Sequence, residues 1–247
     1  MVEPYKTMIV SAYYKIPSKQ SHSNYIPYLQ RWFRSLSAPA IFFTTPDMYE
    51  EILSWGYSLT QIQFVMLPIT EFTAFQKYGY SFWEEQCRID VEKYHTPELA
   101  GIWYEKKEFV RRAMNIYCEE TIFIWCDAGC IRDQESENAF CQFGMREATL
   151  NDNTIHLQYI NSIIKSFYCY PDRSIAGAII AGNRNAWIAH CELYDTVIEE
   201  YLSANICLNM DQYIIKSCAD RKPDLYTLHT IPAMNRIDEW FFFLGVL

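Results

Sequence analysis

Residues 7–12 read TMIVSA, a short and continuous apolar run of the kind found in buried strands. Residues 25–36 follow with aromatic and leucine side chains at helical spacing. A second apolar run, AIFFT at residues 40–44, comes before a helix with capping signals at residues 45–56, and residues 61–67 form a third strand. Strand, helix, strand, helix and strand in this order predict an α/β fold with a mainly parallel sheet flanked by helices.

The composition indicates a globular chain with one core. Of the 247 residues, 50% are hydrophobic, which is enough for a large packed interior. No repeat, low-complexity stretch or linker interrupts the sequence, so we expect a single domain over residues 1–247. The formal net charge of -9 offers no basic footprint for DNA or RNA, and we expect no nucleic-acid partner.

The cysteines and the apolar runs bear on location. Nine cysteines occur singly, without a C-x-x-C pair, which is typical of free thiols in a reducing compartment. The sequence shows no export signal, and its longest apolar runs are about 8 residues, compared with the ~20 of a membrane span. We therefore expect a cytoplasmic protein without a transmembrane segment. Residues 240–244 (WFFFL) either pack in the core or make peripheral contact with a membrane.

A carboxylate follows the most apolar strand of the sequence. Residues 121–126 read TIFIWC, and Asp127 comes directly after them. Because ligands bind at the carboxyl ends of strands in such sheets, Asp127 is a candidate functional residue. Gly129 would let a ligand approach the backbone, and Arg132 supplies a permanent cation nearby. An aspartate after a strand is also a common turn former, so both interpretations of Asp127 stay open.

A lysine lies on the apolar side of a predicted helix. Thr96 and Pro97 are start signals for a helix that extends to about residue 117. Lys106 falls on its apolar stripe. Either the stem of Lys106 runs along the stripe to water, or its amine meets a carboxylate or phosphate at the sheet edge.

Two further segments carry candidate residues. Residues 174–183 are apolar but contain Gly177, and glycine inside a strand often marks close approach by a ligand or another backbone. Asp211 and Gln212 come just before an apolar helix. The Asp211 carboxylate either caps that helix or lies, with the Gln212 amide, beside a sugar.

Five of these segments in order resemble a known family. They are residues 9–15 (IVSAYYK), 95–106 (HTPELAGIWYEK), 125–132 (WCDAGCIR), 175–177 (IAG) and 211–212 (DQ). This ordered set is similar to the HtrL/YibB (WlaTC-type) glycosyltransferases, a family linked to surface polysaccharide synthesis. The resemblance implies a GT-A-like fold with a mixed, mainly parallel sheet. It also implies a nucleotide-sugar-binding half at about residues 1–135 and an acceptor half at about residues 136–247.

The resemblance also implies a possible metal ion. In GT-A enzymes a D-x-D motif holds Mn²⁺ or Mg²⁺ on the donor diphosphate, at the end of the strand that here ends with Asp127. This sequence has Asp-Ala-Gly instead, so one usual carboxylate is missing. Asp133 is a possible substitute. His229, after another predicted strand, is a candidate ligand beside Asp127.

The resulting hypothesis is transfer of a sugar from a nucleotide sugar, with UDP as the first guess, to a glycan acceptor. Lys106 would offset charge on the leaving nucleoside diphosphate. Asp211 would act as a general base if configuration inverts, or stabilise an oxocarbenium-like state if it is retained. The residues expected to bind the nucleotide sugar are Ala12, Tyr13, Tyr14, Lys15, Asp127, Gly129, Arg132, Gly177 and Gln212.

Two alternatives to this hypothesis remain. The missing second aspartate favours a non-catalytic module that binds nucleotide or glycan on a transferase scaffold. A nucleotidyltransferase that makes the activated sugar would normally need a glycine-rich, basic loop after the first strand. Residues 15–23 contain no glycine, which argues against it.

Overall fold

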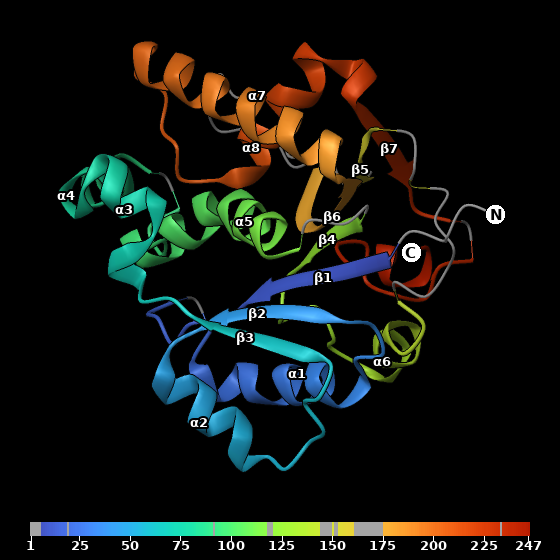
Figure 1. Ribbon diagram of the computed structural model, residues 1–247. Coiled ribbons are helices and arrows are strands. Elements are labelled where there is room, and N and C mark those ends of the chain that lie inside the picture. Colours follow the sequence, from blue (N-terminus) through green and yellow to red (C-terminus); the bar gives the residue numbers. More distant parts are fainter. Residues whose placement is uncertain are drawn as a thin grey trace.

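The computed structural model describes residues 6–18, 20–90, 92–117, 121–143, 150, 153–160, 175–232 and 234–247. Within these ranges, seven strands pair into one sheet in the order β3-β2-β1-β4-β6-β5-β7 (Figure 1). The strands are β1 (Lys6–Ala12), β2 (Ala40–Thr44), β3 (Ile62–Met66), β4 (Thr121–Cys126), β5 (Ile155–Tyr159), β6 (Ile175–Asn183) and β7 (Tyr226–Thr230).

The sheet is mixed and mainly parallel. Strand β1 pairs in parallel with β2 and β4, β2 pairs in parallel with β3, and β5 pairs in parallel with β7. Strand β6 is antiparallel to both of its neighbours, β4 and β5. The predicted α/β fold class is therefore confirmed, and the carboxyl ends of β1 to β4 lie at one edge of the sheet.

Helices cover both faces of the sheet. Helices α1, α2 and α6 lie on one face, whereas α5, α7 and α8 lie on the other (Figure 1). The α-helices are α1 (His22–Ser35), α2 (Pro46–Ser54), α3 (Thr73–Tyr78), α4 (Tyr80–Ile89), α5 (Pro97–Ile116), α6 (Gln134–Phe140), α7 (Arg184–Ser203) and α8 (Asp211–Arg221). Three short 3₁₀ helices also occur in the described residues: η1 (Ile69–Glu71), η2 (Pro223–Leu225) and η3 (Phe242–Gly245).

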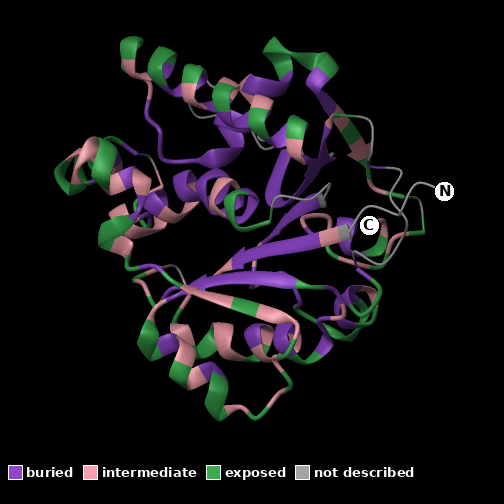
Figure 2. Cartoon of the chain, viewed as in Figure 1, coloured by how far each residue is buried: buried purple, intermediate pink, exposed green. Residues whose placement is uncertain are grey.

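The central strands are apolar throughout because both of their faces are covered. Met8 and Val10 pack in the cluster that contains α5 and α7 residues, while Ile9 between them packs with residues of α1 and α2. Successive strand side chains point to opposite faces, so a strand buried on both sides needs apolar residues at every position. Figure 2 shows this burial in the middle of the sheet and exposed residues on the outer sides of the helices.

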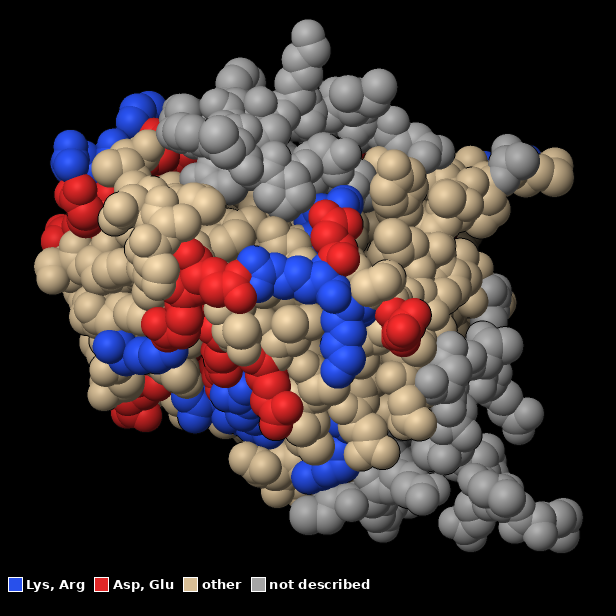
Figure 3. All heavy atoms as spheres, turned by 90° about the horizontal axis from the view of Figure 1, so that it is seen from above, with Lys and Arg blue, Asp and Glu red and all other residues tan. Residues whose placement is uncertain are grey.

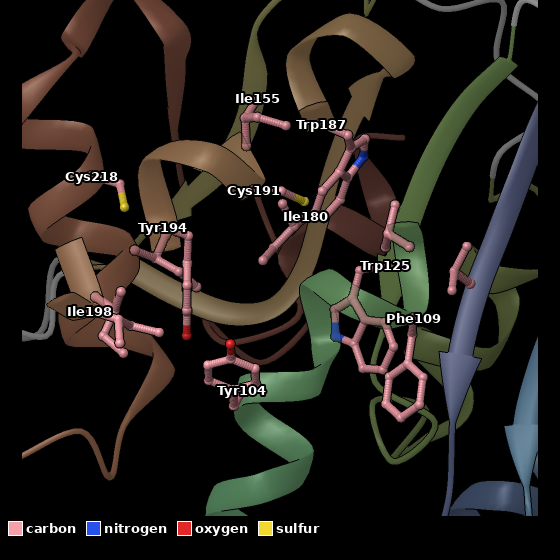
Figure 4. Close-up of a cluster of buried hydrophobic side chains, with 14 of the residues drawn as sticks. Tyr104, Phe109, Trp125, Ile155, Ile180, Trp187, Cys191, Tyr194, Ile198 and Cys218 are labelled. Atoms are coloured by element: carbon pink, nitrogen blue, oxygen red, sulfur yellow. The ribbon is translucent and has the colours of Figure 1, made fainter. Parts of the chain in front are cut away.

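Aromatic packing fixes α5 against β4. The rings of Phe109 and Trp125 are stacked, with centroids 5.7 Å apart and planes 9° apart. Both belong to the buried cluster in Figure 4, which continues to α7 through Trp187 and Tyr194. The predicted start of α5 is also confirmed, because the Thr96 side chain accepts a hydrogen bond from the Leu99 backbone N–H. These contacts therefore fix the position of helix α5 relative to β4.

The C-terminal aromatic run packs in the core. Phe242 and Phe243 are fully buried, and the Gln158 side chain bonds to the backbone of Trp240 (2.9 Å) and of Phe243 (3.0 Å). Of the two interpretations of residues 240–244, core packing is thus the one observed. Across the described ranges, every helix is too short or too polar to cross a bilayer.

The structure describes seven of the nine cysteines. The cysteines in the described ranges are free, whereas Cys118 and Cys169 lie outside those ranges. On the face shown in Figure 3, acidic and basic side chains lie next to each other. Among the described residues, ion pairs form between Lys216 and Asp220 and between Arg221 and Glu200.

Candidate functional site

A cleft opens at the carboxyl ends of β1 and β4. It is lined by residues that follow these strands, by the start of α1, by α5 and by one C-terminal aromatic residue. Seven of the residues predicted from the sequence line this one cleft: Ala12, Tyr13, Tyr14, Lys106, Asp127, Gly129 and Arg132. The parallel pairing of β1 and β4 explains this, because it delivers both strand ends to the same edge.

Lys106 lies on the floor of the cleft between two carboxylates. Its Nζ is 2.8 Å from Asp211 Oδ2, 3.2 Å from Asp127 Oδ1 and 3.4 Å from Asp127 Oδ2. It also donates a hydrogen bond to the Gly177 carbonyl at 2.9 Å. The Lys106 side chain is only 8% exposed. Of the two interpretations of Lys106, contact with carboxylates is therefore the one observed.

Local structure positions each carboxylate of this cluster. The Trp125 ring, held against α5, donates from Nε1 to Asp127 Oδ1 at 2.8 Å, and the Asp127 backbone N–H donates to the Ala178 carbonyl of β6. Asp211 is the first residue of α8, where the helix dipole favours a negative charge. The residue at the N-cap is Met210, so the alternative in which Asp211 caps α8 is wrong.

Gly177 makes room for the Asp211 carboxylate. A Cβ atom at this position would lie 2.7 Å from Asp211 Oδ2, closer than such atoms pack. The group that approaches the glycine of β6 is thus the Asp211 side chain from α8. Gln212, the next residue, donates from Nε2 to the Ile175 carbonyl at 2.7 Å and ties α8 to the same strand.

The cluster of Lys106, Asp127 and Asp211 has one positive and two negative groups. Burial alone would lower the pKa of Lys106, but the two carboxylates outweigh it and raise this pKa, so the ammonium stays charged. Burial raises the pKa of Asp127; Lys106 opposes this and Asp211 adds to it, and the net shift is upward. The two carboxylates also differ in access, since the Asp127 side chain is 35% exposed and that of Asp211 only 6%.

Aromatic side chains form one wall of the cleft. The Tyr13 hydroxyl is 2.8 Å from His22 Nδ1, and His22 Nε2 is 3.0 Å from Glu51 Oε1. Tyr25 packs beside Tyr13, with ring centroids 5.9 Å apart, and it lies so close to Gly129 that a Cβ there would be 2.9 Å from its ring. Flat, partly polar surfaces of this kind suit a nucleobase or a sugar ring.

A cation lies at the rim of the cleft. Arg132 is exposed, and its guanidinium group is 4.6 Å from the ring centroid of Phe241 and 5.8 Å from that of Tyr28. These rings hold the side chain over the cleft without neutralising it, which leaves its charge available to an anion.

Other predicted residues have different surroundings. Tyr14 is 3% exposed and stacks on Phe109, so it mainly supports the cleft from below. Lys15 is not among the residues that line the cleft, and its amine pairs with Glu51 at 2.6 Å. Asp133 is the N-cap of α6, with its side chain accepting from the Ser136 backbone.

The predicted metal ligands do not come together. His229 lies on β7, which is separated from β4 by β6 and β5, and its Nε2 is 2.8 Å from His156 Nδ1. The carboxylates of Asp127 and Asp211 contact the Lys106 ammonium instead. In the part of the chain that the structure describes, no three His, Cys, Asp or Glu side chains are grouped to hold a metal ion. These donors therefore do not fit a divalent cation in their present arrangement.

Several residues of the cleft were not predicted from the sequence. His22 and Tyr25 come from the first turn of α1, and Phe241 comes from the C-terminal segment. Tyr25 belongs to the apolar spacing that predicted α1, which indicated packing and not a cleft. Phe241 reaches the cleft only through the fold, so its position in the sequence carried no signal.

No protein-family model and no curated protein sequence matches the chain. Among solved structures, it is similar to a glycosyltransferase involved in the glycosylation of the major capsid of PBCV-1, at 13% identity and a TM-score of 0.45, over 91% of this chain and 81% of that one. It is also similar to CMP:2-keto-3-deoxy-manno-octonic acid synthetase complexed with CTP, at 11% identity and a TM-score of 0.47, over 95% and 93% of the two chains. Similarities of this size decide neither substrate nor reaction, and membership of the HtrL/YibB family stays a prediction.

Proposed function

We propose that the chain is a glycosyltransferase that binds a nucleotide sugar in the cleft at the ends of β1 and β4 and transfers the sugar to a glycan. The observation that carries this proposal is the charged Lys106 ammonium on the floor of an aromatic-walled cleft, beside a carboxylate that faces the opening. Such a cleft offers a flat surface for a nucleoside and a cation for its phosphates.

The charges of the cleft support binding of a diphosphate. Lys106 lies on the floor and Arg132 at the rim, so an anion between them would meet positive charge from two sides. Negative charge grows on the leaving nucleoside diphosphate as the sugar bond breaks. Preorganised cations in a partly buried cleft stabilise this charge, and single donors of this kind contribute roughly 3–4 kcal/mol.

The geometry favours Asp127 over Asp211 as the proton acceptor. Asp211 is almost fully buried and does not line the cleft, which fits a residue that positions Lys106. Asp127 is more exposed, and the upward shift of its pKa makes it a better base than an ordinary surface aspartate. The sequence predicted Asp211 as the general base. We now propose Asp127 for this role.

The lining of the cleft and the HtrL/YibB resemblance support finer features of the proposed function. The cleft takes nearly all of its lining from residues 12–132, which supports a nucleotide-sugar-binding half at about residues 1–135. A surface glycan as acceptor, a UDP sugar as donor and a cytoplasmic location rest on the HtrL/YibB resemblance and on composition. The non-catalytic binding module stays the second candidate, because the ion pair with Lys106 partly neutralises Asp127.

Release of nucleoside diphosphate tests this proposal. A thermal-shift screen of nucleotides and nucleotide sugars identifies the donor, since a ligand at ~100 times its Kd stabilises the fold by about 2.7 kcal/mol. We expect the wild-type chain to hydrolyse this donor slowly and to transfer its sugar when acceptor is present.

Asp127→Asn should lose both reactions while it stays folded. Asp195→Asn, which removes an equally exposed carboxylate outside the cleft, should keep them. Near-normal turnover by Asp127→Asn would refute the role of this residue. A donor that binds but is never cleaved would instead favour the non-catalytic module.

A further inference from the structure

The Lys106 ammonium is surrounded by oxygen atoms from three separate segments. Two belong to Asp127 after β4, one to Asp211 at the start of α8 and one to the Gly177 carbonyl of β6, all within 3.4 Å. The Gly177 carbonyl and Asp127 Oδ2 accept hydrogen bonds from this ammonium, and Asp211 Oδ2 and Asp127 Oδ1 pair with its charge. Lys106 therefore fills the space between the two carboxylates.

A divalent cation would need the same oxygens. Mg²⁺ binds carboxylate oxygens at about 2.0–2.1 Å and prefers six ligands in a regular arrangement. To reach both Asp127 and Asp211 it would have to displace an ammonium group whose side chain is only 8% exposed. Two positive centres between the same carboxylates would also repel each other strongly, because little solvent reaches the Lys106 ammonium to screen them.

Asp127 is the partner that can leave Lys106. Its contacts with Nζ, at 3.2 and 3.4 Å, are longer than that of Asp211 at 2.8 Å, and its side chain is the one open to the cleft. Asp211 is held by burial and by the space at Gly177. An incoming phosphate oxygen can thus replace the Asp127 carboxylate at the ammonium while Asp211 keeps Lys106 in position.

We propose that Lys106 serves as a built-in cation for the diphosphate of the donor, which exchanges with Asp127 at Nζ, so that binding needs no divalent metal. This inference rests on the proposed function, because it presumes that the cleft binds a nucleoside diphosphate group. The exchange also releases the Asp127 carboxylate from its ion pair in the complex, where it is needed as a proton acceptor.

Calorimetric titration of UDP, GDP, CDP and ADP in EDTA tests the metal independence. We expect at least one of them to bind the wild-type chain in EDTA, with an affinity that Mn²⁺ changes by less than about threefold. Binding that appears only with Mn²⁺ would overturn the inference and leave the proposed function standing. If none binds with or without Mn²⁺, the proposed function falls, and the inference falls with it.

The variant Asp127→Asn tests the exchange at Lys106. Removing a negative group that competes with the phosphate should leave nucleotide affinity in EDTA unchanged or increase it by up to about tenfold. Asp195→Asn is the matched control, and its affinity should equal that of the wild type. If Asp127 instead held a metal ion, Asp127→Asn would lose nucleotide affinity, and that loss would contradict the exchange.

Discussion

Two consecutive lysines of α5 differ in what surrounds them. At the cleft, Lys106 is the single cation between two carboxylates, those of Asp127 and Asp211. Lys107 lies in a second buried network on α5 and α7, where its amine pairs with Glu108 and, at 2.8 Å, with Asp195. Arg111 joins this network through both acids. The network around Lys107 is thus balanced, with two cations and two anions, whereas the cluster around Lys106 is not.

The pKa values of the two half-buried carboxylates, Asp127 and Asp195, shift in opposite directions because of this difference. The side chains of Asp127 and Asp195 are 35% and 34% exposed, so access to water does not distinguish them. Burial tends to raise both pKa values. For Asp195, Lys107 and Arg111 outweigh burial and lower the pKa, while for Asp127 a second carboxylate adds to burial and the pKa rises. Balanced charges stabilise the fold, and unbalanced charges at a cleft are available to a ligand.

The largest expected effect on stability comes from replacing Lys106 or Lys107 by methionine. Lys106→Met would leave the buried Asp211 and the half-buried Asp127 without their cation, and we expect the free energy of unfolding to fall by about 3–5 kcal/mol. Lys107→Met should lose less, because Arg111 still contacts Glu108 and Asp195. Urea denaturation of both variants measures the difference. Equal losses would mean that charge balance does not distinguish the two sites.

A methyl group on β6 should disturb the Lys106 cluster without changing its charge. Gly177→Ala would push a Cβ against Asp211, and we expect it to lose about 1–3 kcal/mol of stability and to weaken nucleotide binding. Gly182→Ala on the same strand would meet Ile155 and the Thr154 carbonyl instead. It should lose similar stability but keep nucleotide affinity. A Gly177→Ala variant with wild-type affinity would show that the position of Asp211 does not matter for binding.

Removing the charge of one of the two half-buried aspartates, Asp127 or Asp195, should change the stability of the fold with opposite signs. Asp127→Asn relieves an excess negative charge, so its stability should stay the same or rise by up to about 1 kcal/mol. Asp195→Asn removes a carboxylate that two cations stabilise, and its stability should fall by about 1–2 kcal/mol after allowance for exposure. Thermal or urea unfolding at neutral pH checks both; a fall for Asp127→Asn as large as that for Asp195→Asn would contradict the proposed imbalance.

The smallest expected effect is in the pH dependence of stability. Because the pKa of Asp127 is raised above 3.8 in the folded state, the folded chain holds this proton more tightly than the unfolded chain. Protonation of Asp127 should therefore stabilise the fold as the pH falls from neutral toward 3.8. The pKa of Asp195 is lowered, so the stability that its carboxylate contributes should be lost only as the pH falls below 3.8.

The comparison with Asp127→Asn isolates this effect. His190, whose pKa burial lowers to about 3, acts in the opposite direction between pH 6.5 and 3, but it does so equally in the wild type and the variant. Wild-type stability relative to Asp127→Asn should rise on acidification by under about 1 kcal/mol. A relative fall would mean that the Asp127 pKa is lowered in the folded state.

Local patterns predicted much of the fold. The runs at residues 7–12 and 121–126 became β1 and β4, and Thr96 caps α5 as expected. The sheet order could not be predicted, because β1 pairs with β4 and β5 pairs with β7, and these partners are not consecutive strands in the chain. No turn or periodicity signal specifies such long-range partners.

The part of the candidate site that lies at the end of a strand could be predicted from the sequence. Asp127 and its nearness to Lys106 and Arg132 followed from the end of β4 and from the stripe of α5. The contact of Lys106 with Asp211 joins residues 105 positions apart, and only tertiary packing creates it. For Lys15 and His229 the residue types suit phosphate or metal, but Glu51 and His156 are their partners in the fold.

Calorimetry on the two lysine variants tests the central claim most directly. The nucleoside diphosphate that binds the wild-type chain most tightly is titrated in EDTA into wild type, Lys106→Met and Lys107→Met, at a temperature where circular dichroism shows all three folded. We expect at least about a tenfold loss of affinity for Lys106→Met and less than about a threefold change for Lys107→Met. Equal affinities for the two variants would contradict it, because the diphosphate would then not bind at Lys106.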